Sequence, residues 1–387
     1  MTPTAGSPPS SRPAIDPAAP AILTIDLAAL CDNYKTLKAR APGAECAAVV
    51  KADAYGTGAA RAVNALAQAG CGTFFVATLE EARRIQGSAE GATLYVLDGL
   101  FPDAAPAFAE IDARPVLGSL QEVEEWAGYC TATGTKRPAA IHIDTGMNRL
   151  GLTAHDVETL GQKRQDLAAF TPVLVMSHLA CGDNPDDPMN EDQRAAFDRL
   201  RQKLPPAPAC LANSAGVFLG ERFHYDMVRP GVSLYGGRAV TGAPNPMKPV
   251  VRLDVRIVQI RDAEAGESVG YGAARNLIRR TRIATAAAGY ADGLFRHLSA
   301  GDGETGLTAY IGDYPLPILG RVSMDSITLD ITDLPDDLVR RGTLVELLGG
   351  HIGVDDLAEK AGTIGYEVLT SLGHRYQRIY LEPGSQG

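Results

Sequence analysis

Short apolar runs that alternate with amphipathic stretches are the feature that most constrains the fold of this chain. Between about residues 22 and 235, helical patterns such as Ala59–Gln68 and Glu191–Lys203 separate these runs. Such alternation is typical of parallel strands joined by crossover helices. The runs that we interpret as strands are Ala47–Val50, Thr73–Ala77, Thr93–Leu97, Arg114–Leu117, Ala139–Asp144, Pro172–Ser177, Ala209–Ala212 and Met227–Val228. About eight strands close a TIM-like barrel, so we predict an eight-stranded α/β barrel, with a doubly wound open sheet as the alternative.

Beyond about residue 240 the pattern becomes that of a second domain. The runs Val251–Ile257, Ser326–Ile331 and Arg375–Leu381 alternate polar with apolar residues, and glycine-containing turns separate them. One short helix is expected near Val354–Ala361, and a Gly/Pro-rich segment at 242–246 forms a plausible boundary. We therefore predict a disordered tail (1–20), the barrel (21–245) and a mostly β C-terminal domain (246–387).

Composition limits the classes of partner and compartment. A net charge of −10 and an isoelectric point near 5.3 argue against nucleic acid or an anionic membrane as a partner. No apolar run approaches the ~20 residues of a membrane span, and the first 20 residues lack the apolar core of a secretory signal. Because the six cysteines are scattered and no histidine stands at metal-ligand spacing, we expect reduced thiols, no metal site and a cytoplasmic protein.

The predicted barrel gathers polar groups at the carboxyl ends of its strands, where barrel enzymes carry their active sites. These groups are Lys51, Arg149, His178, Asn213, Ser214, Arg229 and Gly231. A lysine at the end of a buried strand is poorly solvated, which lowers its pKa and makes its amine a usable nucleophile. The alternative is a lysine that reaches from the strand end to water.

A phosphate site is indicated next to this lysine. The Ser214 hydroxyl and the main-chain N–H groups of the turn at 229–233 suit an anion, and Gly231 permits close approach of the backbone. The motif at 213–216 could also be a plain helix N-cap. A Schiff-base lysine beside a phosphate cradle favours pyridoxal phosphate (PLP), although a sugar-phosphate aldolase would need the same two features.

Two stretches of the C-terminal domain are candidates for chemistry, Gly289–Gly293 and Gly320–Asp325. Tyr290, held between glycines, could be an exposed acid–base group or a tyrosine that only packs beside a turn.

Taken together, these motifs resemble those of the alanine racemase family. The chain contains AVVKADAYGTG (48–58), HIDTGMNRLG (142–151), SHLA (177–180), ANSAG (212–216), VRPGVSLYG (228–236), GYADG (289–293), GRVSMD (320–325) and GYEV (365–368). They follow the family's order and span nearly the whole chain. The resemblance implies a PLP-dependent isomerase, a barrel followed by a β domain, and a head-to-tail homodimer with active sites at its interface.

The resemblance also implies roles for individual residues. Lys51 would hold PLP and serve as one catalytic base, and Tyr290 of the partner subunit would be the other. L- and D-alanine would interconvert through an external aldimine of PLP, supplying D-alanine for peptidoglycan. Cofactor-binding residues would be Lys51, Tyr55, His178, Ser214, Arg229, Gly231, Val232 and Tyr366, and substrate-binding residues Arg149 and the Met324 N–H. We expect His178 and Arg229 to form a cationic chain.

One departure from the family concerns His142, which stands where many members carry a carbamate-modified lysine that orients the arginine matching Arg149. An imidazole supplies no negative charge, so a chloride or another carboxylate could take that role. Three alternative functions are a broader amino-acid racemase, a PLP-binding barrel without turnover, and a decarboxylase of basic amino acids. The C-terminal domain opposes the second, and the absence of the expected cysteine-bearing motif weakens the third.

Overall fold

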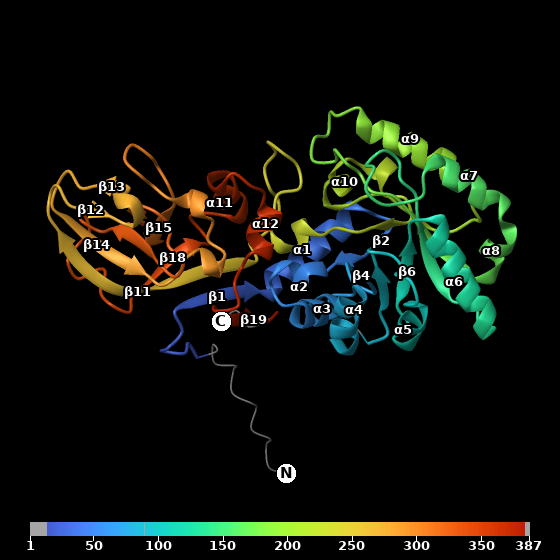
Figure 1. Ribbon diagram of the computed structural model, residues 1–387, viewed down its shortest axis with the longest axis horizontal. Coiled ribbons are helices and arrows are strands. Elements are labelled where there is room, and N and C mark those ends of the chain that lie inside the picture. The colour runs from blue at the N-terminus through green and yellow to red at the C-terminus, as the bar shows by residue number, and fades with distance from the viewer. Residues whose placement is uncertain (1–13, 89, 384–387) are drawn as a thin grey trace, which may run out of the picture. The chain divides into compact units, whose positions relative to one another are not determined.

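The computed structural model describes residues 14–88 and 90–383 and divides them into two compact units (Figure 1). The barrel unit comprises Ala29–Lys248, and the β unit combines the described residues up to Ala28 with those from Pro249 onward. None of the helices in these described residues is both long and apolar enough to cross a bilayer. All six cysteines lie in the described part, and none of them forms a disulfide.

The barrel unit confirms the predicted α/β barrel. Its strands, all parallel, are β2 (Glu45–Cys46), β3 (Ala48–Val49), β4 (Thr73–Val76), β5 (Thr93–Val96), β6 (Arg114–Leu117), β7 (Pro138–His142), β8 (Thr171–Met176), β9 (Ala209–Cys210) and β10 (Met227–Val228). β2 and β3 flank Ala47 and act as one strand, with β2 paired to β10 and β3 paired to β4. The Ala47 and Val49 N–H groups donate to the carbonyls of Val228 and Pro230, both at 2.9 Å. These bonds bring the ends of the sheet together into a nearly closed barrel.

Helices lie between successive strands and cover the outside of this barrel (Figure 1). They are α1 (Leu27–Arg40), α3 (Ala59–Gln68), α4 (Leu79–Ile85), α5 (Ala105–Glu110), α6 (Leu120–Thr133), α7 (Ala154–Gln162), α8 (Arg164–Ala169), α9 (Met189–Arg201) and α10 (Ser214–Phe218). The short element labelled α2 (Lys51–Tyr55) follows β3 and is not an ordinary helix, because its interior backbone angles are left-handed. Thr78, Ser119 and Thr153 cap α4, α6 and α7 by accepting main-chain N–H groups with their hydroxyls. Strand β4 is buried along its whole length because the barrel interior and the helix layer cover its two faces.

The β unit is built on an antiparallel sheet with the order β16-β15-β18-β11-β1-β19, in which only β1 and β19 are parallel. β14 extends from β11 and pairs in turn with β17. The strands are β1 (Ala21–Asp26), β11 (Val251–Ala263), β14 (Thr281–Ala286), β15 (Thr308–Ile311), β16 (Tyr314–Pro317), β17 (Ile327–Asp330), β18 (Leu344–Leu348) and β19 (Gln377–Leu381), with a separate hairpin of β12 (Ser268–Val269) and β13 (Arg275–Asn276). Its helices are α11 (Val354–Ala361), as predicted, and α12 (Gly365–Thr370).

The first strand corrects the expected domain boundaries. The sequence assigns residues 21–245 to the barrel, whereas β1 pairs with β11 and β19 in the β unit. The predicted tail lies partly outside the described residues, but Ala14 and Asp16 are described and both hydrogen-bond the side chain of Gln377. The β unit is therefore assembled from both ends of the chain.

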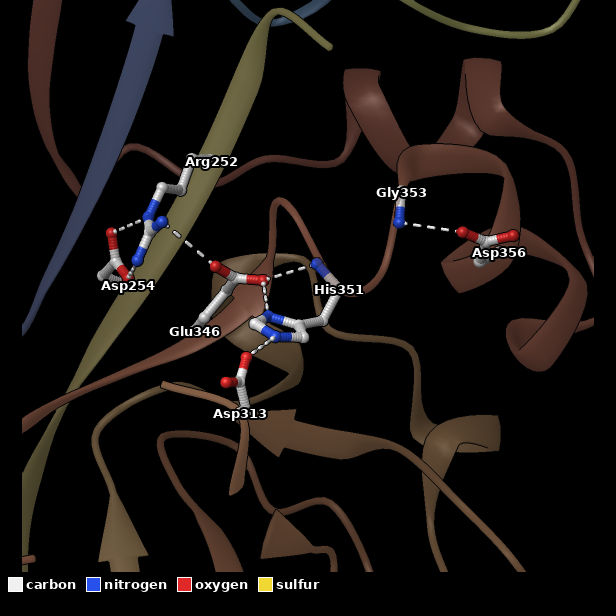
Figure 2. Close-up of polar contacts among 7 residues, drawn as sticks. All are labelled: Arg252, Asp254, Asp313, Glu346, His351, Gly353 and Asp356. Carbon is white, nitrogen blue, oxygen red and sulfur yellow. Dashed lines mark hydrogen bonds and ion pairs between the residues drawn. The ribbon is translucent and has the colours of Figure 1, made fainter. Parts of the chain in front are cut away.

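A buried carboxylate joins several elements of the β unit (Figure 2). Glu346 on β18 accepts the His351 main-chain N–H at 2.9 Å, contacts the His351 ring at 3.0 Å and pairs with Arg252 of β11 at 3.1 Å. Arg252 is also held by Asp254, and the His351 ring stacks on Tyr310. Burial raises the pKa of the Glu346 carboxyl, but the donors from His351 and Arg252 outweigh burial, so the pKa is lowered. The cluster ties the turn after β18 to β11.

Candidate functional site

Lys51 stands immediately after β3, at the start of a left-handed turn. Ala52, Asp53, Ala54 and Tyr55 all have φ between 52° and 54°, a region that non-glycine residues rarely adopt. Left-handed helical geometry costs roughly 1–2 kcal/mol per residue, so the surrounding contacts must impose it. Hydrogen bonds from Gly58 N–H to the Asp53 carbonyl (2.9 Å) and from Ala59 N–H to the Asp53 carboxylate (2.7 Å) hold its far end. The turn redirects the chain abruptly at the candidate nucleophile.

The surroundings of Lys51 favour its neutral amine. Burial lowers the pKa of Lys51, and the positive charge of Arg149 lowers it further. The negative charges of Asp98 and Glu81 act in the opposite direction without cancelling the shift. A larger fraction of neutral amine makes this lysine a better nucleophile and base than an exposed one.

Arg229 and His178 form a buried pair on neighbouring parts of the barrel. The Arg229 guanidinium donates to His178 Nδ1 at 2.8 Å and to the Leu211 carbonyl at 3.2 Å, and it is almost fully buried. Burial and the adjacent Arg229 charge lower the pKa of His178 well below its ordinary value. The expected cationic chain is therefore wrong for the histidine, because the ring is neutral and the positive charge stays on Arg229.

A small polar cradle lies at the ends of β9 and β10. Ser214 Oγ accepts the N–H groups of Gly231 at 2.8 Å and Ser233 at 3.3 Å. A Cβ built on Gly231 would lie 2.3 Å from the Tyr55 hydroxyl, so only glycine allows this approach. Val232 opens the turn η3 (Val232–Tyr235), which leaves its N–H without an acceptor inside that turn. The structure thus brings together four of the predicted phosphate-binding residues.

The same segment also contains the helix cap that we considered as the alternative. Asn213 caps α10, since its side-chain oxygen accepts the Gly216 N–H at 3.0 Å. The capping role belongs to Asn213, and Ser214 faces the turn that contains Gly231. The helix cap is therefore present at Asn213, and the neighbouring Ser214 remains the predicted phosphate-binding residue.

Arg149 and His142 line a cavity of about 290 Å³ together with Asp98 and Glu122. Burial and the charge of Arg229 lower the pKa of His142 to about 4, so its ring is neutral. Glu122 is already engaged by the N–H groups of Leu100 and Gly118. Within residues 14–88 and 90–383, no carboxylate forms an ion pair with the Arg149 guanidinium. His142 does not replace the charge of a carbamate.

Two family models match successive parts of this chain. The family model described as "Alanine racemase, N-terminal domain" matches residues 25–239, and "Alanine racemase, C-terminal domain" matches residues 250–380. The chain belongs to the alanine racemase family. An alanine racemase of Methylobacterium nodulans is 49% identical over 94% of this chain and 96% of its own. A relative from Agrobacterium fabrum, 48% identical over 94% of this chain and 92% of its own, is named "Alanine racemase, catabolic".

Solved structures of alanine racemases have the same fold. The enzyme of Bartonella henselae, described with covalently bound pyridoxal phosphate, superposes with a TM-score of 0.89 at 41% identity, over 94% of this chain and 100% of its own. A biosynthetic alanine racemase of Pseudomonas aeruginosa superposes with a TM-score of 0.85 at 33% identity, over 94% of this chain and 100% of its own.

The remaining site residues expected from the alanine racemase resemblance lie in the β unit. Tyr290 N–H donates to the Ser323 carbonyl and Ala291 N–H to the Met324 carbonyl, both at 3.0 Å, which holds the two motifs side by side. Arg375 secures this arrangement by binding the carboxylates of Asp292 and Asp325. Tyr290 is 44% exposed and Met324 is 52% exposed.

Tyr366 belongs to the same unit, on α12, and 40% of its surface is exposed. The β unit therefore presents Tyr290, Met324 and Tyr366 on its surface, whereas the barrel unit gathers Lys51 with its own neighbours. Sequence reasoning missed one residue at the barrel site of this alanine racemase family member, Glu81. Its signal was the capping-box spacing from Thr78 to Glu81.

Proposed function

We propose that this chain is an alanine racemase that interconverts L- and D-alanine with pyridoxal phosphate as its cofactor. The observation that carries the proposal is a lysine of lowered pKa at the end of β3, in the same barrel mouth as the Ser214 cradle. The racemase with bound pyridoxal phosphate from Bartonella henselae supports the choice of cofactor.

The residues present fit this cofactor. Lys51 would bind its aldehyde carbon, and Tyr55, Ser214, Gly231 and Val232 would hold its phosphate, with Tyr366 as a further phosphate ligand. The close approach of Gly231 to Tyr55 leaves no room for a Cβ. When bound, pyridoxal phosphate supplies an electron-withdrawing ring that makes the α-proton of an attached amino acid acidic.

Racemisation needs a proton acceptor on one face of the α-carbon and a donor on the other. Lys51 Nζ, whose pKa is lowered by burial and by Arg149, serves one face. The Tyr290 hydroxyl of a second subunit serves the opposite face, in agreement with its exposed position in the β unit. Arg149 and the Met324 N–H would bind the substrate carboxylate.

Arg229 limits side reactions. A guanidinium does not give up its proton, so it can only donate to the cofactor's ring nitrogen. With Arg229 there, the ring nitrogen would stay unprotonated, the ring would withdraw electron density less strongly, and transamination would be disfavoured. The neutral His178 positions Arg229 by accepting its Nη2–H at 2.8 Å.

The C-terminal match favours turnover over a PLP-binding barrel that only carries cofactor. We further propose a cytoplasmic location, because cysteines without disulfides are typical of a reducing compartment. We also propose a homodimer, because the proposed two-base site takes its Tyr290 hydroxyl from a second subunit. We propose that the enzyme supplies D-alanine for peptidoglycan. Because some relatives are named catabolic, degradation of D-alanine is the competing role. A deletion strain that grows without added D-alanine would favour this degradative role.

Exchange of the α-proton tests the two-base assignment. Deuterium incorporation into L- and D-alanine should be followed in solvent D₂O with Lys51→Ala and Tyr290→Ala. We expect Tyr290→Ala to lose exchange from L-alanine only, since one face would keep its base. Equal behaviour of the two enantiomers in this variant would contradict separate bases.

A further inference from the structure

The carboxylate of Glu81 joins the loops that follow two neighbouring strands. Its Oε1 accepts the Ala52 N–H at 2.7 Å, immediately after Lys51. Its Oε2 accepts the N–H groups of Ala77 at 2.8 Å and Thr78 at 3.4 Å, which follow β4. One side chain thereby links the lysine turn to the start of α4.

Helix capping alone does not account for this arrangement. The Thr78 hydroxyl accepts the Glu81 N–H at 3.2 Å, which completes an ordinary capping box within α4. Asp156 forms the corresponding box in α7, and its carboxylate stays on Thr153 of the same helix start. The bond from Ala52 to Glu81 is an addition that the cap does not require.

A second glutamate shows that such bridging recurs at this end of the barrel. Glu122, at the equivalent position of α6, accepts the Leu100 N–H at 2.9 Å after β5 and the Gly118 N–H at 2.6 Å after β6. Loops after neighbouring strands are therefore linked in pairs by capping glutamates. Of these two links, that of Glu81 is the one that reaches the residue next to Lys51.

The Ala52 N–H is the group through which Glu81 can restrain the backbone of Lys51. That N–H lies in the same rigid peptide plane as the Lys51 carbonyl, so holding it restricts the backbone rotation that aims the Lys51 side chain. Ala52 is also the first of the four left-handed residues, whose geometry is unfavourable without external support. A carboxylate accepting a main-chain N–H forms one of the stronger hydrogen bonds available there.

We propose that Glu81 is a positioning residue for Lys51, which holds the left-handed turn and the backbone of the lysine in place through the Ala52 N–H. The role rests on the proposed function of Lys51, because positioning matters only if that amine does chemistry. Glu81 also acts through its charge, since the anion raises the pKa of Lys51 against burial and Arg149. Geometry and charge can be separated by substitution.

The test compares Glu81→Gln and Glu81→Asp with the capping variant Asp156→Asn as a matched control. Hydrogen–deuterium exchange of the segment 51–58 reports the turn, and the pH dependence of acylation at Lys51 reports its amine. Both are measured on the full chain freed of cofactor. A glutamine oxygen can accept from only one of the two loops, so we expect exchange at 51–58 to accelerate at least about tenfold. Loss of the anion should move the acylation profile to lower pH.

Glu81→Asp keeps the charge but is too short to span both loops. We expect it to accelerate exchange at 51–58 with a smaller movement of the acylation profile, and it also serves if Glu81→Gln does not fold. Asp156→Asn should accelerate exchange only near 153–157. Unchanged exchange at 51–58 in both Glu81 variants would overturn the proposal, whatever the acylation profile does.

A separate experiment tests the proposed function of Lys51 independently of the role of Glu81. Borohydride reduction of the parent protein with pyridoxal phosphate should attach the cofactor to Lys51, located by peptide mass. If another residue were labelled, the function of Lys51 would be wrong, while the exchange data would still decide whether Glu81 holds the turn.

Discussion

The barrel unit and the β unit carry their candidate residues in opposite ways. In the barrel unit, Lys51, Arg229 and the Ser214 cradle lie among buried groups that adjust their charge and fix their geometry. In the β unit, Tyr290 and Met324 are exposed, although their backbones are firmly held by the Arg375 bridge. The barrel residues are thus set by buried neighbours, whereas the β-unit residues are held at the backbone and exposed at the side chain. Under the proposed function, the exposed groups would act in the site of a second copy.

Removal of the barrel's amine should have the largest effect on activity. Lys51→Ala removes the proposed cofactor attachment and one base, so we expect racemisation to fall at least about 10⁴-fold. The initial rate from each alanine enantiomer measures this. A variant that kept a tenth of the parent rate would show that Lys51 is not essential for catalysis. The proposed catalytic role of the buried barrel residues would then be wrong.

Removal of the phenol from the β unit should be the next largest effect. Tyr290→Phe is expected to lower kcat about 10²–10⁴-fold, the usual contribution of a general acid–base group. Because the side chain is exposed and its turn is held by main-chain bonds, the melting temperature should stay within about 1 °C of the parent. A large fall in melting temperature with little loss of kcat would make Tyr290 a packing residue.

A smaller effect is expected at Gly231, because the phosphate cradle needs a residue without a side chain there. Gly231→Ala would place a Cβ 2.3 Å from the Tyr55 hydroxyl, which must move. We expect the Kd for pyridoxal phosphate to rise about tenfold or more, with a stability loss of about 1–3 kcal/mol. Gly128→Ala is a suitable control, because nothing lies within 4 Å of its Cβ position. Equal cofactor affinity in both variants would argue against the cradle.

The smallest effect concerns stability in the β unit. The pKa of Glu346 is lower in the folded chain than in the unfolded chain, so its contribution is present above the unfolded pKa and is lost as pH falls through the folded value. Glu346→Gln should cost about 1–3 kcal/mol at pH 7 and progressively less in acid. Urea unfolding followed across this pH range measures it. A pH-independent difference would show that the cluster in Figure 2 acts by packing rather than charge.

The sequence predicted local features better than distant ones. Alternating runs revealed the barrel strands, and the turn motifs located Lys51 and Ser214. The pairing of β1 with β11 was not predictable, because its partners lie more than 220 residues away and only non-local contacts select them. The neutral state of His178 depends on its burial and on the adjacent Arg229 guanidinium, which only the folded chain brings together. The left-handed run after Lys51 was equally hidden, since three of its four residues are alanine or tyrosine, which rarely adopt this conformation.

Complementation between two inactive variants tests the central claim most directly. If the amine of one copy works with the phenol of another, a mixed dimer of Lys51→Ala and Tyr290→Phe contains one site with both groups intact. After subunit exchange at equal concentrations, random pairing makes about half of the dimers mixed, and about a quarter of parental activity should return. A mixture that stayed as inactive as its two components would contradict the account.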